Sequence, residues 1–159
     1  MGRSKREPYV RLTRPLVRDA GVLRPAGWDE ALDRAAEGFR RNIAAGGPSA
    51  FGLFSRTGHA PSVAGLVKVF GGWNPTQMLA AMERGDMTAV YVIGENPVQS
   101  DCARTITLMS NLDHLVVQDV FLTKTAQLAH VVLPASTAWD DIELVRELAR
   151  RLGHSVALS

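Results

Sequence analysis

Residues 88–135 constrain the fold more than any other part of the chain, because they alternate short apolar runs with segments of helical spacing. The apolar runs are brief and rich in β-branched residues, which is typical of buried parallel strands. They span Ala89–Ile93, Leu115–Val117 and Val131–Leu133. The segments between them, Ser100–Leu112 and Thr123–Ala129, have the spacing of amphipathic helices. This alternation predicts a parallel sheet with right-handed crossovers.

The flanking sequence predicts further elements of the same kind. They are an extended segment at Tyr9–Arg18, a turn at Arg18–Gly21, a strand at Ala50–Phe54, and helices at Trp28–Ala45, Val63–Phe70, Thr76–Arg84 and Trp139–Leu152. We therefore expect an α/β fold with a mostly parallel, Rossmann-like sheet of about four strands and helices on both faces. Trp28 is predicted to be a core anchor, and His59 a plain loop histidine.

The composition limits the class of protein. Of the 159 residues, 46% are apolar and 21% are charged, which is ordinary for a soluble globular domain. We expect a disordered basic tail at residues 1–8, rather than a nucleic-acid patch, and a single α/β domain at residues 9–159. The sequence has neither an apolar run of the roughly 20 residues that span a bilayer nor a signal peptide, so we expect a cytoplasmic protein. The single cysteine, Cys102, excludes an internal disulfide and a cluster site made of cysteines alone.

Two polar loops, Gly94–Pro97 and Gln118–Asp119, follow the first two strands of the central stretch. Open α/β sheets bind ligands beyond the carboxyl ends of their strands, so these loops are the first candidates for a functional site. Gly94 permits positive φ directly after a strand, and Asn96 offers both donors and acceptors. Ser100 lies at the start of the next predicted helix, whose free N–H groups suit a phosphate. A structural turn followed by a helix cap explains the same residues.

Asp119 ends the second strand, where a carboxylate can accept hydrogen bonds from ribose hydroxyls or from the paired N–H donors of guanine. Thr123 begins the following predicted helix, where its hydroxyl suits a second phosphate. The alternative is that both residues only cap the turns that follow them. Because the three places would converge on one side of the sheet, the pattern favours a nucleotide-like ligand over scattered caps.

Longer stretches of the chain resemble a known family. They read RLTRPLVR…GWDEALDRAAEGFRRN, VAGLVKVFGGWNPTQMLAAMERGDM, AVYVIGENPVQSD, NLDHLVVQDVFLTKTAQLAHVVLPA and DDIELVRELARRLG. In this collinear order, from Leu12 to Gly153, they are similar to the large subunit of molybdopterin-dependent oxidoreductases, and in particular to the formate dehydrogenase alpha subunit.

The resemblance implies a molybdenum or tungsten cofactor held by two molybdopterin guanine dinucleotides. The positions that match the family's cofactor loops, and would seat one dinucleotide, are Gly94, Glu95, Asn96, Ser100, Gln118, Asp119 and Thr123. The first four would hold the guanosine-pyrophosphate arm, Gln118 and Asp119 its guanine or ribose end, and Thr123 would lie near the same pocket. The partners that it implies are this guanine dinucleotide cofactor and other oxidoreductase subunits, with no nucleic acid.

The sequence also departs from the family pattern. The N-terminal cysteine-rich segment is absent, so we expect no iron–sulfur cluster in this chain. The segment that carries the metal-binding cysteine or selenocysteine is missing near residues 55–58, and a second family segment is missing near residues 134–139. Cys102 stands where the family usually has proline, and His130 where it usually has aspartate. We therefore expect an internally deleted, truncated form with no catalytic or metal-binding residues and no catalysis of its own.

Two other functions fit the same residues. One is an accessory module that binds a nucleotide or a partner subunit, and the other is a non-functional remnant of the enzyme. Retained cofactor loops favour binding, whereas exposed apolar patches would favour a remnant or an obligate partner.

Overall fold

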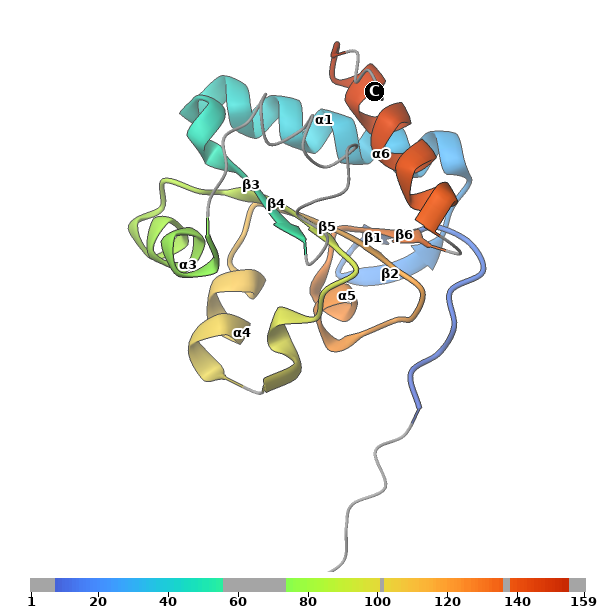
Figure 1. Cartoon of the computed structure of the whole chain (residues 1–159), viewed down its shortest axis with the longest axis horizontal. Helices are drawn as coiled ribbons and strands as arrows, with labels where there is room; N and C mark the ends of the chain where they lie inside the picture. The colour runs from blue at the N-terminus through green and yellow to red at the C-terminus, as the bar shows by residue number, and fades with distance from the viewer. Residues whose placement is uncertain (1–7, 56–73, 101, 136–137, 155–159) are drawn as a thin grey trace, which may run out of the picture.

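The computed structural model describes residues 8–55, 74–100, 102–135 and 138–154, which form an α/β fold around one six-stranded sheet (Figure 1). The strands are β1 Leu16–Asp19, β2 Val22–Pro25, β3 Phe51–Ser55, β4 Ala89–Ile93, β5 His114–Asp119 and β6 Val131–Pro134. Their order across the sheet is β2-β1-β6-β5-β4-β3, and the four strands from β6 to β3 are parallel. The predicted parallel core is confirmed, but the prediction of about four strands is wrong, because the sheet has six.

The two additional strands form a hairpin at one edge of the sheet. β1 runs antiparallel to both β2 and β6, so the sheet is mixed. Ala20 and Gly21 have φ angles of 48° and 79°, the two positive values that a two-residue type I′ hairpin requires. The sequences of these strands, LVRD and VLRP, contain charged residues and a proline and are mostly half-buried or exposed. The hairpin was therefore not recognisable from an apolar run.

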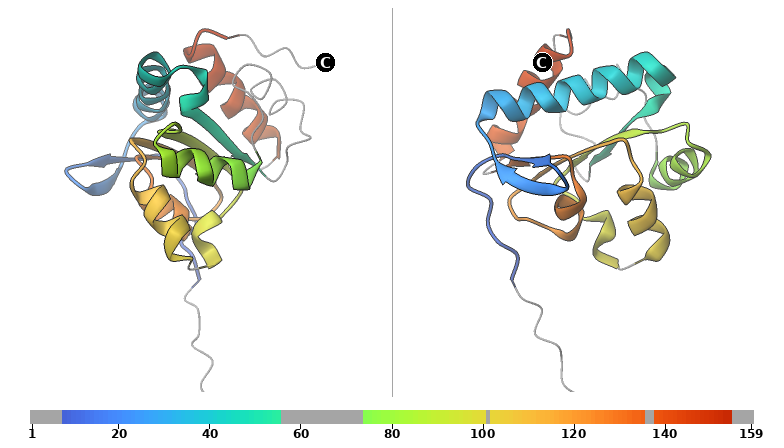
Figure 2. Two further views of the ribbon diagram at one scale, coloured as in Figure 1. Left: turned by 90° about the vertical axis from the view of Figure 1, so that its left-hand side faces the viewer. Right: turned by 180° about the vertical axis from the view of Figure 1, so that it is seen from behind.

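Helices cover both faces of the sheet, as predicted. The helical elements are α1 Trp28–Gly46, α3 Pro75–Arg84, α4 Ala103–Ser110, α5 Lys124–Leu128 and α6 Ala138–Arg151, with short 3₁₀ turns η1 Pro48–Ala50 and η2 Pro97–Ser100. Figure 2 shows α1 and α6 on one face and α3, α4 and α5 on the other. The molecule thus has three layers, with the sheet in the middle.

The core follows the two-residue repeat of the central strands. All five residues of β4 are buried. Ala89, Tyr91 and Ile93 pack into the cluster beneath α1 and α6, whereas Val90 and Val92 pack into the cluster beneath α3 to α5. Burial on both faces is the reason that β4 appears in the sequence as an uninterrupted apolar run.

The close approach of α1 to β5 depends on a glycine. Gly38 lies buried in the middle of α1, and a Cβ atom at this position would lie 2.2 Å from the ring of His114. One turn earlier, the backbone carbonyl of Ala35 lies 3.0 Å from Nε2 of His114. The helix is therefore held against the sheet both by tight packing and by a hydrogen bond.

Several element ends differ from the prediction. α4 begins at Ala103 and not at Ser100, because the η2 turn occupies the intervening positions. α3 begins at Pro75, one residue before the predicted start at Thr76, and is capped by Asn74 in a capping box. Trp28 is not a core anchor, because it lies at the start of α1 with 42% of its surface exposed.

Other predictions fall wholly or mainly outside the described residues. They concern the tail at 1–8, His59, the helix at Val63–Phe70 and the two junctions at 55–58 and 134–139. Of the helices that the structure describes, none has the length and apolar character needed to cross a membrane.

Candidate functional site

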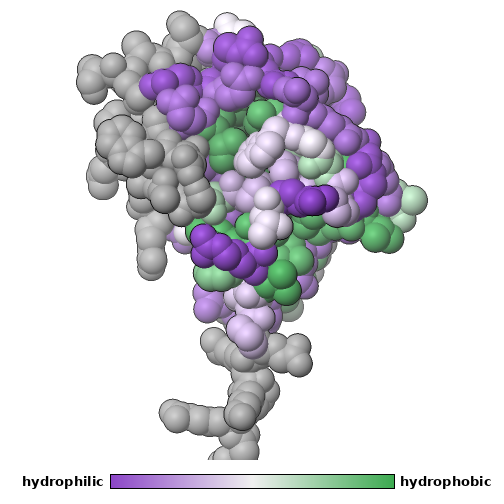
Figure 3. Space-filling view, turned by 90° about the vertical axis from the view of Figure 1, so that its right-hand side faces the viewer, coloured by the Kyte–Doolittle hydropathy of each residue, from purple (hydrophilic) through white to green (hydrophobic). Residues whose placement is uncertain are grey.

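The carboxyl ends of three neighbouring strands, β4, β5 and β6, lie together at one end of the sheet. The N–H of Gly94, after β4, donates to the carbonyl of Gln118 in β5 at 2.9 Å. The N–H of Ala135, after β6, donates to the carbonyl of Asp119 at 2.9 Å. The sheet therefore brings the two predicted loops side by side. Figure 3 looks onto this side of the molecule, where apolar surface lies between polar margins.

The turn after β4 presents backbone donors. Gly94 has φ of 62°, and a Cβ atom built on it would meet no atom within 4 Å. Within the described part of the chain, the backbone N–H groups of Glu95 and Asn96 make no hydrogen bond. Successive free N–H groups next to a left-handed residue form the kind of concave turn that binds anions.

The side chain of Asn96 points back into the protein. Its Oδ1 atom accepts hydrogen bonds from the N–H of Thr125 at 3.2 Å and from the hydroxyl of Thr125 at 2.7 Å. Its Nδ2 atom lies 3.4 Å from the hydroxyl of Tyr9. The Thr125 hydroxyl in turn accepts from the N–H of Val98 at 3.2 Å. Asn96 and Thr125 together hold the shape of the turn.

The sequence did not predict that Thr125 holds this turn, although Thr125 is fully buried and bonded to both Asn96 and Val98. The hydrogen bond joins Thr125 to Asn96, which lies 29 positions earlier, so the local sequence gives little indication of it. The spacing Thr-x-Thr at 123–125 is the only local pattern that points to a role for Thr125. Thr123 itself is the N-cap of α5, and its hydroxyl oxygen accepts from the N–H of Ala126 at 3.1 Å. Ser100 is the last residue of η2 and does not cap α4.

The side chains of Gln118 and Asp119 do not meet, because adjacent residues of a strand point to opposite faces. Gln118 is completely buried on the α1 and α6 side, where its Oε1 atom accepts a hydrogen bond from the hydroxyl of Tyr91. Asp119 is half-buried at the strand end, and its Oδ1 atom accepts from the N–H of Phe121 at 3.2 Å. Of the two, Asp119 is the side chain nearer to solvent.

A segment far away in the sequence completes this edge. The N–H of Leu12 donates to the carbonyl of Val120 at 2.9 Å, and the N–H of Leu122 donates to the carbonyl of Val10 at 2.8 Å. Residues 10–12 therefore lie antiparallel to residues 120–122, beside the turn after β4. An extended segment was predicted here, but its pairing with residues 120–122 was not.

His130 lies away from this site. It precedes β6, so it belongs to the amino ends of the strands, and its Nδ1 atom accepts the N–H of Leu115 at 3.0 Å. Burial lowers the pKa of its imidazole, and the positive charge of Arg18 lowers the pKa further. The change from aspartate to histidine at this position therefore does not alter the polarity of the candidate site.

A sheet of this topology, with loops gathered at the carboxyl ends of its parallel strands, defines an open α/β domain of the ligand-binding type. The chain belongs to the molybdopterin oxidoreductase family, whose family model matches residues 11–74 and 57–155. These two matches together cover most of the chain.

Similar proteins include several formate dehydrogenases. The putative formate dehydrogenase YrhE of Bacillus subtilis is 48% identical over 67 residues, which cover 41% of this chain and 7% of that protein. Formate dehydrogenase H of Escherichia coli is 35% identical over 82 residues, which cover 50% of this chain and 11% of that protein. Among solved structures, acetylene hydratase from Pelobacter acetylenicus matches 63% of this chain and 20% of its own chain, with a TM-score of 0.45 and 24% identity. This chain thus spans only a small part of its relatives.

Proposed function

We propose that this chain binds the guanosine-pyrophosphate arm of a molybdopterin guanine dinucleotide and does not catalyse a reaction by itself. The observation that carries the proposal is the turn at Gly94–Asn96, which offers open space beside a left-handed glycine and two backbone N–H groups with no partner among the described residues. A pyrophosphate fits such a turn because its oxygens accept hydrogen bonds and its charge needs no specific side chain.

The side chains around the turn act as its support. Asn96 and Thr125 fix the path of the backbone, and Thr123 starts the helix that carries Thr125. In the proposal Glu95 borders the phosphates from within the turn, and Ser100 borders them from the end of η2. When bound, the metal of this cofactor supplies the two-electron chemistry, while the protein supplies position and environment.

The guanine or ribose end of the ligand is proposed to lie against Asp119. A carboxylate has about four lone-pair positions and can accept several hydrogen bonds at once, and one of those that Asp119 accepts comes from the N–H of Phe121. Gln118 takes part through its backbone carbonyl, which holds Gly94, and through its hydrogen bond from Tyr91. Both contacts keep the strand end in register with the turn.

The absence of independent catalysis is proposed from the missing family segment near residues 55–58. The family model matches in two pieces that overlap only at 57–74, next to this junction, which supports an internal deletion there. The similar F420-dependent formate dehydrogenase of Methanocaldococcus jannaschii is named as a subunit alpha, which supports further oxidoreductase subunits as partners.

Calorimetric titration with inorganic pyrophosphate tests the proposal through Asn96→Asp. Aspartate keeps the Oδ1 acceptor for Thr125, so the turn remains formed, but its negative charge repels the ligand. We expect about tenfold weaker binding of pyrophosphate, from a repulsion of about 1.4 kcal/mol. Asn111→Asp is the matched control, because it makes the same charge change after α4, at the opposite edge of the sheet. Equal binding by wild type and Asn96→Asp would contradict the proposal.

A further inference from the structure

A cavity lies at the carboxyl ends of the same strands, on the side covered by α1 and α6. Its volume is ≈ 500 Å³, and its walls come from four separate parts of the chain: residues 11–13, the start of α1, the end of β6 and the middle of α6. None of the residues proposed to hold the pyrophosphate lines it. It is therefore a separate pocket that the proposed function does not use.

The aromatic wall of this pocket is Trp28. The residue begins α1, yet 42% of its surface remains exposed, although the apolar stripe of the helix predicted burial. Leu32 and Leu144 line the same pocket and supply apolar surface beside the indole. A half-exposed indole next to aliphatic walls is a suitable surface for stacking a flat ring.

Three polar groups at this pocket have capacity for a ligand. The guanidinium of Arg11 and the hydroxyl of Thr13 make no hydrogen bond or ion pair with any other described residue. Glu143 uses Oε1 to accept from Arg146 at 2.7 Å, and its Oε2 atom has no contact in the described part of the chain. One cation, one hydroxyl and one carboxylate oxygen thus line the same pocket as the exposed indole.

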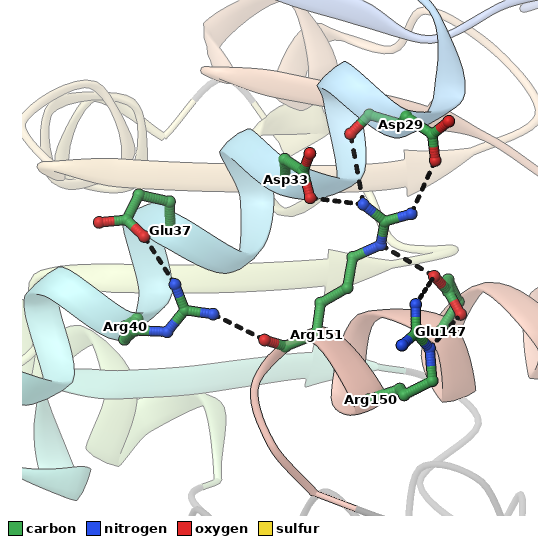
Figure 4. A network of polar contacts seen from close by, with 7 residues as sticks. All are labelled: Asp29, Asp33, Glu37, Arg40, Glu147, Arg150 and Arg151. Atoms are coloured by element: carbon green, nitrogen blue, oxygen red, sulfur yellow. Dashed lines mark hydrogen bonds and ion pairs between the residues drawn. The ribbon is translucent and has the colours of Figure 1, made fainter.

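Glu147 also lines the pocket but has no such capacity. Both of its oxygens accept hydrogen bonds from Arg150, and Oε1 accepts a further one from Arg151 (Figure 4). These contacts, with that of Arg150 the largest cause, lower the pKa of its carboxyl to about 2. Glu147 therefore stays ionised, and both of its oxygens are already hydrogen-bonded to arginines. Glu143 is the carboxylate in this pocket that can accept hydrogen bonds from a ligand.

We propose that this pocket binds a purine nucleoside monophosphate. The base stacks on Trp28, the phosphate pairs with Arg11, and the N–H donors of a guanine ring reach Glu143. Guanine is favoured over adenine because its adjacent ring and exocyclic N–H groups both match a carboxylate, whereas adenine presents an acceptor at the corresponding ring position. The site stands independently of the pyrophosphate turn.

Calorimetry of the full chain with guanosine monophosphate, guanosine and adenosine monophosphate tests this assignment. Trp28→Leu should weaken guanosine monophosphate and guanosine alike, by about 5- to 150-fold, because both lose the stacking contact. Arg11→Gln should weaken only the phosphate-bearing ligand, by about tenfold. Arg14→Gln is the matched control, since Arg14 is an exposed arginine nearby that does not line the pocket.

A third variant tests the choice of base. Glu143→Gln should reduce the preference for guanosine monophosphate over adenosine monophosphate. Glu37→Gln is its control, because Glu37 is also exposed on a helix and also paired with an arginine three residues on. If Trp28→Leu does not fold, Trp28→Phe keeps the apolar packing and an aromatic face and should retain most of the binding.

Two results would overturn the assignment. One is that no nucleotide binds at millimolar concentration, or that binding is unchanged by both Trp28→Leu and Arg11→Gln. The other is that Asn96→Asp, and not the pocket variants, abolishes nucleotide binding, which would place the ligand on the turn after β4 and leave the proposed function intact. The assignment is supported if Trp28→Leu and Arg11→Gln weaken the binding of guanosine monophosphate while Asn96→Asp leaves it unchanged. This holds whether or not pyrophosphate binds to the turn after β4.

Discussion

His114 is a buried ionisable residue whose tautomer follows from its neighbours. Its Nε2 atom lies 3.0 Å from the carbonyl of Ala35, which can only accept, so the proton resides on Nε2. Burial lowers the pKa of the imidazole to about 4, and this effect outweighs the opposing hydrogen bond. The positive charge of Arg41 and the neighbouring His130 lower the pKa slightly further.

This residue predicts an acid-sensitive stability. Because the folded state has the lower pKa, its contribution is complete above the unfolded value of 6.5 and is lost as the pH falls from 6.5 towards 4. The free energy of unfolding from urea denaturation should fall by about 2 kcal/mol between pH 7 and pH 5. His114→Gln should remove the larger part of this dependence, and the half-buried His130, whose pKa burial also lowers, contributes to the remainder. The same slope in His114→Gln and wild type would mean that another group is responsible.

Polar contacts centred on Arg151 join α6 to α1 (Figure 4). Arg151 donates to Asp29 at 2.8 Å, to Asp33 at 2.5 Å and to Glu147 at 2.9 Å, and its side chain is only 16% exposed. Arg40 in α1 donates to the carbonyl of Arg151 at 2.6 Å. The end of α6 therefore meets α1 through polar contacts, in addition to the apolar packing of residues such as Leu148.

Arg151→Met should lower the free energy of unfolding by about 1–3 kcal/mol, because it leaves three carboxylates without their common cation. Arg146→Met is the matched control, since Arg146 has a single pair with Glu143 on the surface of the same helix and should change stability by less than about 0.5 kcal/mol. Chemical denaturation at neutral pH measures both. Equal losses in the two variants would show that Arg151 does not join the helices energetically.

How well each element could be predicted depended on its burial. Ala89–Ile93 was predicted at its observed bounds because a strand buried on both faces must be apolar throughout. In the hairpin, the extended segment up to Arg18 and the turn at Arg18–Gly21 were predicted, but β2 was missed, because its charged residue Arg24 is stabilised by an ion pair with Asp19 and not by burial. The bonds between Asn96 and Thr125, and the exposure of Trp28, arise from contacts between distant segments, which local sequence patterns do not report.

Across the whole sheet, the carboxyl and amino ends of the parallel strands differ in the groups that they carry. The carboxyl ends carry the open turn at Gly94–Asn96 and the Trp28 pocket. The amino ends carry His114, His130 and a charged pocket of ≈ 460 Å³. The features proposed to bind ligands thus gather at the edge where open α/β sheets bind them, and the pH-sensitive core contact lies at the other edge.

The proposal that this chain binds the cofactor is tested most directly by measuring the pterin and guanine nucleotide that co-purify with it. The protein would be expressed in cells that synthesise molybdopterin guanine dinucleotide. The purified, folded protein would be denatured, and the released pterin and guanine nucleotide quantified by mass spectrometry. We expect near-equimolar pterin and guanine in the wild type, a marked loss in Asn96→Asp, and no loss in Asn111→Asp. A folded wild-type protein that releases neither compound would contradict the account.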